Sequence, residues 1–128
     1  MKNNDKLVNL IHKYLKHDHN TILHININDE CINHLENKIK NTVFIKQENV
    51  QDNGKIYDII LISTKKDSPL SGLIEDIKKY SKKDQQYIIQ VPKDFMFDSF
   101  VRSINSEEFD IYNNTKDDFY YIWTKMIL

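Results

Sequence analysis

The sequence stands out for what it lacks: its 128 residues include no alanine, one cysteine and only two glycines, Gly54 and Gly72. A single cysteine, Cys31, excludes a disulfide within the chain and is typical of a reducing compartment. The scarcity of glycine also excludes an ordinary glycine-rich nucleotide turn, which needs glycine for its backbone angles. Asparagine, lysine and isoleucine are abundant instead. This bias is typical of AT-rich coding, so a lone Asn or Lys carries little weight.

Charge of one sign and long apolar runs are also missing. The net charge is −1, which predicts no broad basic face for nucleic acid or for an acidic membrane. No apolar run approaches the roughly 18 residues of a membrane-spanning helix. Residues 1–20 have neither the apolar core nor the cleavage site of a signal peptide. We therefore expect a cytoplasmic protein with residues 1–128 in a single domain, and neither a membrane nor a nucleic acid as partner.

The first half of the chain alternates helix and strand patterns. Apolar residues recur at helical spacing over 5–16, and 21–27 alternates as a strand, with Ile22, His24 and Asn26 on one face and Leu23, Ile25 and Ile27 on the other. Asn28 or Asp29 can cap a helix with a buried stripe at Ile32, Leu35 and Ile39. Residues 42–48 predict a second strand. The apolar run 56–63 predicts a central strand covered on both faces.

The second half continues the alternation. Ser68-Pro69 predicts the start of a helix that runs to Tyr80, and 86–91 predicts a buried strand stopped by Pro92. A further helix is expected around 97–104. Residues 109–112 and 119–126 predict a hairpin around Asn113-Asn114. The order predicts an α/β three-layer sandwich, with a mostly parallel sheet and an antiparallel C-terminal strand.

The segment TILHININDECINHL, residues 21–35, combines a strand, a sharp turn and a helix, the arrangement that often holds a nucleotide cofactor. The order of elements resembles the class I S-adenosylmethionine-dependent methyltransferases, and YDIILIST, QQYIIQVPKD and FYYIWTKMI resemble that family's later strands. The resemblance implies a Rossmann-like topology. It is a shortened one, because only TVFIKQENVQDNGK fills the place of a further strand–helix unit.

The resemblance also implies where the cofactor site would lie. The family's acidic residue falls on His24, its three glycines fall on Asn26, Asn28 and Glu30, and its ribose-binding carboxylate falls on Glu48. Asparagine tolerates a left-handed backbone, so the turn can survive. Side chains and the charge of Glu30 would nevertheless enter the cofactor's space. The turn is therefore interpreted as vestigial, with no catalytic residue and no bound cofactor expected.

A narrower resemblance is to the N-terminal domain of the anamorsin family, in which IYDIILIST and FYYIWTKM have similar counterparts. It implies a non-enzymatic domain that binds a protein partner in cytosolic iron–sulfur cluster assembly. The family's cluster-binding cysteines follow a linker, and Cys31 is the only cysteine here. Two alternatives stay open: a minimal methyltransferase that binds S-adenosylmethionine through Glu48, or an inactive regulatory subunit of another methyltransferase.

The other polar groups give weaker indications of a functional site than the turn at 21–35. The His-Asp-His run at 17–19 could supply metal ligands, but a site needs three or four that converge, so no metal is expected. Cys31 and His34 could touch on one helix, with no third group to orient them. In the aromatic strand 119–123, the face with Tyr120 and Ile122 is either core or a partner surface, and the pattern favours core.

Overall fold

The computed structural model describes residues 5–15, 18–48, 55–64, 70–80, 82–92, 109–113 and 119–125. Helices and strands alternate along this part of the chain, as the hydrophobic pattern predicts. The elements are α1 (Asp5–Tyr14), β1 (Asn20–Ile25), α2 (Asp29–Lys38), β2 (Thr42–Gln47), β3 (Ile59–Ser63), α3 (Leu70–Tyr80), β4 (Gln86–Pro92), β5 (Phe109–Asn113) and β6 (Phe119–Lys125).

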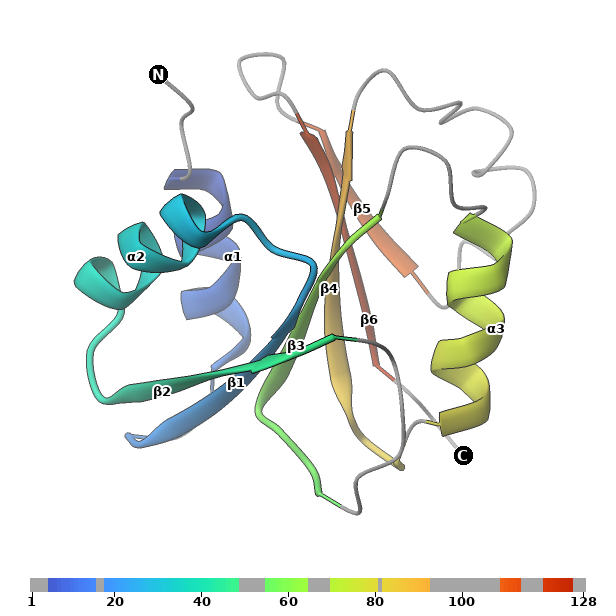
Figure 1. The fold of residues 1–128 in the computed structure, drawn as a ribbon, viewed down its shortest axis with the longest axis horizontal. Helices are drawn as coiled ribbons and strands as arrows, with labels where there is room; N and C mark the ends of the chain where they lie inside the picture. Colours follow the sequence, from blue (N-terminus) through green and yellow to red (C-terminus); the bar gives the residue numbers. More distant parts are fainter. Residues whose placement is uncertain are drawn as a thin grey trace.

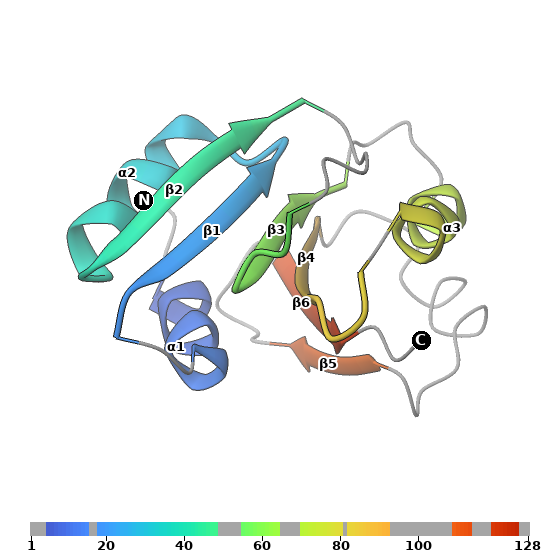
Figure 2. The ribbon, with the colours of Figure 1, turned by 90° about the horizontal axis from the view of Figure 1, so that it is seen from below.

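The strands form one six-stranded sheet in the order β2-β1-β3-β4-β6-β5 (Figure 2). The four strands β2, β1, β3 and β4 are mutually parallel, whereas β6 is antiparallel to both β4 and β5. Parallel neighbours need crossover connections, and helices α2 and α3 lie within two of them. The predicted mixed sheet and its antiparallel C-terminal hairpin are therefore confirmed.

Helices cover both faces of the sheet and give the molecule three layers. Helices α1 and α2 lie on one face and α3 lies on the other (Figure 1). Two apolar clusters fill the spaces between the layers, one under α1 and α2 and one under α3. The central strand β3 contributes to both, with Ile59 and Leu61 in the first and Ile60 and Ile62 in the second. This explains its nearly continuous apolar run.

Two local expectations are wrong. Ile27 was expected on the face of Leu23 and Ile25, but β1 ends at Ile25 and Ile27 packs with Ile22 under α1 and α2. The chain turns sharply at Asn26, which breaks the alternation. Pro92 was expected to follow the strand, but it is the last residue of β4. The expected helix at 97–104, the Ser68-Pro69 start and most of the hairpin turn lie outside the described residues.

The aromatic strand β6 packs on both faces, which decides between its two readings. Tyr121 is buried under α1 and α2, Ile122 is buried under α3, and Tyr120 packs against the same cluster as Ile122. The Trp123 ring stacks on Tyr14 with centroids 4.5 Å apart. Ile122 therefore belongs to the core and Tyr120 packs against it, as the pattern favours.

Hydrogen bonds fix the end of the sheet where β3 and β4 begin. The buried Gln85 side chain accepts a hydrogen bond from the Tyr57 amide (2.8 Å) and donates one to the Tyr57 carbonyl (2.7 Å). The Asp58 carboxylate accepts a hydrogen bond from the Thr21 amide (2.7 Å). These contacts hold the entry to β3 against β1 and β4. The turn between β1 and α2, which the sequence singles out, lies at the opposite end of these strands, where the parallel strands finish.

Replacing Leu61 by alanine should lower the free energy of unfolding by about 2–5 kcal/mol, because a buried leucine at the centre of the sheet would leave a cavity. Leu61 is 1% exposed and lies between His24 and Ile88 on the neighbouring strands. Urea denaturation measures the change. The matched control is Lys83→Ala in the exposed turn before β4, which should cost under about 0.5 kcal/mol. Equal costs would contradict this core.

Candidate functional site

The turn between β1 and α2 keeps a sharp shape without glycine. Asn26 has φ of 60°, in the left-handed region, and its side-chain amide donates a hydrogen bond to the Ser63 carbonyl (3.0 Å). Asn28 is the N-cap of α2, and its side-chain oxygen accepts from the Glu30 amide (2.8 Å). Asparagine is among the few residue types that readily adopt the left-handed backbone and also serve as an N-cap. The resemblance places three family glycines on Asn26, Asn28 and Glu30. Of these three residues, only Asn26 has a positive φ.

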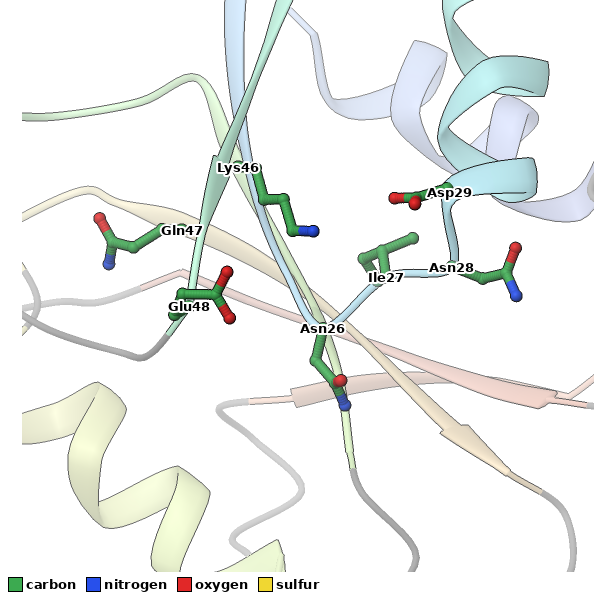
Figure 3. A pocket seen from close by; sticks show the side chains of 7 residues that line it. All are labelled: Asn26, Ile27, Asn28, Asp29, Lys46, Gln47 and Glu48. Atoms are coloured by element: carbon green, nitrogen blue, oxygen red, sulfur yellow. The ribbon is translucent and has the colours of Figure 1, made fainter.

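A pocket of about 430 Å³ opens beside this turn, at the carboxyl ends of β1 and β2 (Figure 3). In a parallel sheet the carboxyl ends of the strands lie at the same end of the sheet. Ligands of such folds usually bind there. The volume lies within the range of small-molecule sites. The described residues that line it are Asn26, Ile27, Asn28, Asp29, Lys46, Gln47 and Glu48.

Charged groups from two elements converge on this pocket. Figure 3 shows the Lys46 ammonium from β2 and the Asp29 carboxylate from α2 pointing toward each other. The Glu48 carboxylate, just after β2, turns toward the space between that strand and Asn26, whereas the Gln47 amide points to the opposite side of β2. The pocket thus holds two carboxylates and one ammonium. Ile27 is the single apolar residue among the described lining residues, and the Ile27 side chain is itself buried in the core.

The structure brings together three of the five residues that the sequence singles out. Asn26, Asn28 and Glu48 all line the pocket, although they come from different elements. Glu30 does not line it, although it lies in the first turn of α2 together with Asp29, which contributes a carboxylate to the pocket. His24 lies within β1 and is not among the described lining residues.

Sequence reasoning missed four lining residues: Ile27, Asp29, Lys46 and Gln47. The signal that could have found them is the parallel pairing of two strands. It places the last residues of β2 beside the turn that follows β1.

His24, at which the sequence resemblance implies an acidic residue, is a buried histidine in β1. It is 5% exposed and pairs in register with Lys46 on β2. Among the described residues, its buried Nδ1 atom has no hydrogen-bond partner. Burial lowers the pKa of His24, and the nearby positive charge of Lys46 lowers it further, against the opposing effect of Asp29 and Glu36. The lowered pKa favours the neutral imidazole of His24.

The other candidate groups do not form a metal site among the described residues. In the described part of the chain, no three His, Cys, Asp or Glu side chains are grouped so as to hold a metal ion. Cys31 is buried in the core under α1 and α2, and His19 is exposed, while His17 lies outside the described residues. No described helix is long and apolar enough to cross a membrane.

Comparison with known proteins places the fold among the methyltransferases. No family model and no curated protein matches the chain by sequence. Among solved structures, a release-factor-specific protein-(glutamine-N5) methyltransferase from Alicyclobacillus acidocaldarius matches with a TM-score of 0.58 and 10% identity, over 98% of this chain and 92% of that one. A putative ribosomal RNA methyltransferase from Plasmodium falciparum matches with a TM-score of 0.54 and 15% identity, over 96% of each chain.

A larger enzyme matches over part of its length. Phosphoethanolamine N-methyltransferase 2 from Haemonchus contortus, solved in complex with S-adenosyl-L-methionine, has a TM-score of 0.63 and 13% identity, and this chain covers 37% of it. These matches show that the chain has the class I methyltransferase fold, with a Rossmann-like arrangement of strands. At such low identity they carry no information about activity.

Replacing Asn26 by valine should lower the free energy of unfolding by at least about 1–2 kcal/mol, because a β-branched residue fits the left-handed region poorly. Asn26→Gly is the matched control. Glycine adopts this backbone without strain and loses only the hydrogen bond to the Ser63 carbonyl, so it should cost less. Urea denaturation of the three proteins tests the order. A valine variant as stable as the glycine variant would contradict the assigned turn.

Folding stability should fall as the pH drops below about 6.5, partly because of His24. Its pKa is lower in the folded chain than in the unfolded one, so the unfolded state binds the proton more tightly. This contribution is fully present above the unfolded pKa and is lost as the pH falls toward the folded pKa. The His24→Leu variant should therefore lose less stability than the wild type between about pH 7.5 and pH 5. Parallel stability curves from urea denaturation would contradict this prediction.

Proposed function

We propose that this chain is a methyltransferase-like domain that works through contacts with a protein partner and not as an enzyme. The observation that supports this most is the lining of the pocket where a cofactor would lie. Of its seven described lining residues, six are polar or charged, and the seventh, Ile27, is buried. Sites for small organic ligands are mostly lined by apolar and aromatic side chains. The described lining therefore offers no apolar wall to an adenine ring.

The turn itself adds a second argument. Asn26 and Asn28 carry side chains where glycine would let a cofactor approach the backbone closely. The Asn26 amide is engaged with the Ser63 carbonyl, and the Asn28 side chain caps α2. Asp29 brings a carboxylate to the pocket at the N-terminus of α2, where the cofactor's own carboxylate would otherwise be favoured. Removing several such contacts weakens affinity about tenfold for each 1.4 kcal/mol lost.

The resemblance to the N-terminal domain of the anamorsin family supports a specific form of this proposal. In that form the chain binds a protein partner in cytosolic iron–sulfur cluster assembly and carries neither cofactor nor cluster of its own. The similar segments coincide with β3 and β6, two inner strands of the sheet. A domain with this role needs a stable fold and an accessible surface. It does not need a catalytic pocket.

One observation favours the alternative of a minimal methyltransferase. Glu48 lines the pocket together with Asn26 and Asn28, at the end of β2, where the resemblance puts a ribose-binding carboxylate. The Haemonchus contortus enzyme with this fold was solved with S-adenosyl-L-methionine. Under this alternative, Glu48 would bind the ribose hydroxyls, and the asparagine turn would take the place of the glycine turn.

Isothermal titration calorimetry distinguishes these functions. With S-adenosylmethionine or S-adenosylhomocysteine at about 1 mM, we expect no saturable heat from the purified chain. The matched variant is Glu48→Gln, which keeps the size of the side chain and removes its charge. Micromolar binding that is lost in Glu48→Gln would overturn the proposal and support the minimal enzyme. Micromolar binding that persists in the variant would overturn it as well, with a site that does not depend on Glu48.

A further inference from the structure

The outer edge of β2 has the features of a strand edge to which a further strand can pair. Strand β2 lies at one end of the strand order, and among the described strands only β1 pairs with it. Val43 and Ile45 are 61% and 38% exposed, and both lie on the α3 face of the sheet, beside Thr21 and Leu23 of β1. The apolar cluster under α3 contains no residue of β2. An edge strand with exposed apolar side chains is a template for further pairing.

The hydrogen bonds to β1 define which peptide groups of β2 face outward. The Asn20 amide donates to the Asn41 carbonyl (3.0 Å), and Asn20 is in register with Thr42. Peptide groups alternate in direction along a strand, so in a parallel ladder the groups of Val43 and Ile45 are directed toward β1. Those of Thr42, Phe44 and Lys46 are directed away from it. The outward set is centred on Phe44.

We propose that two copies of this chain associate edge to edge through β2, antiparallel about a two-fold axis at Phe44, and form one sheet that runs through both copies. A two-fold dimer requires a self-complementary surface. With Phe44 opposite its own copy, each Val43 lies opposite an Ile45 of the other copy. Thr42 then lies opposite Lys46. The exposed apolar side chains are thereby paired across the axis.

Charge selects this register over its neighbours. Lys40 and Glu48 are exposed and flank β2 at its two ends. In the Phe44 register each copy brings Lys40 to the end where Glu48 of the other copy lies, so two opposite-charge pairs form once each Glu48 carboxylate, which turns toward the pocket in the single chain, rotates outward. A shift by two residues in one direction puts Lys40 opposite Lys46. A shift in the other direction pairs Val43 with Gln47. Opposite charges across strands stabilise pairing, and like charges oppose it.

Sedimentation velocity over a range of concentrations tests the association. The wild-type chain should show a reversible dimer, and Ile45→Lys should raise the dimer dissociation constant by at least about tenfold. The matched control is Ile56→Lys, which adds the same charge at a residue that is 66% exposed and lies outside β2. It should leave dimerisation unchanged. Circular dichroism of each variant verifies the fold. A wild-type chain that is monomeric throughout, or equal effects of the two substitutions, would overturn the proposal.

A charge exchange tests the register. Lys40→Glu and Glu48→Lys should each weaken the homodimer, because each creates two like-charge pairs. An equimolar mixture of the two variants should form heterodimers more tightly than either variant associates alone, since both pairs then have opposite charges. The mass of the complex measures association, so the result does not depend on cofactor binding by Glu48. A mixture that associates no more tightly than either variant alone would overturn this register. If β2 pairs with a strand of another protein in preference to its own copy, self-association is overturned.

Discussion

The left-handed backbone of Asn26 is the constraint on which the rest of the candidate site depends. It ends β1, reverses the direction of the next side chain so that Ile27 enters the core under α1 and α2, and sets the start of α2 at Asp29. The hydrogen bond from its side chain to the Ser63 carbonyl ties the end of β1 to the end of β3. The pocket beside Glu48 follows from this turn, because the turn brings Asn28 and Asp29 beside the last residues of β2.

A turn of this shape can be kept while the chemistry around it changes. Asparagine supplies the backbone geometry, but its side chain occupies space that glycine would leave open. The buried His24 within β1 has a lowered pKa, and the charges at the pocket come from Asp29, Lys46 and Glu48. The same fold therefore supports different functions, since function depends on the site and not on the topology.

The two edges of the sheet differ in a way that favours contacts at one of them. At the β5 edge, the Tyr112 hydroxyl is hydrogen-bonded to the Tyr14 hydroxyl (2.5 Å) and accepts a hydrogen bond from the Lys13 ammonium (2.9 Å). The ammonium groups of Lys6 and Lys13 also lie over its ring. At the β2 edge, apolar side chains are exposed. Helix α1 thus covers the β5 edge, whereas exposed apolar side chains remain at the β2 edge.

The sequence alone determined the alternation of elements and the central position of β3. Local propensity and burial on both faces of a strand can be read directly from the hydrophobic pattern. It also limited the cap of α2 to Asn28 or Asp29, and the structure shows that Asn28 is the cap. Only the tertiary structure decided that Ile27 changes faces, that Asp29 and not Glu30 lines the pocket, and that Lys46 joins it from another strand. These outcomes depend on one positive φ angle and on the register between β1 and β2, which are properties of the folded backbone that no single segment encodes.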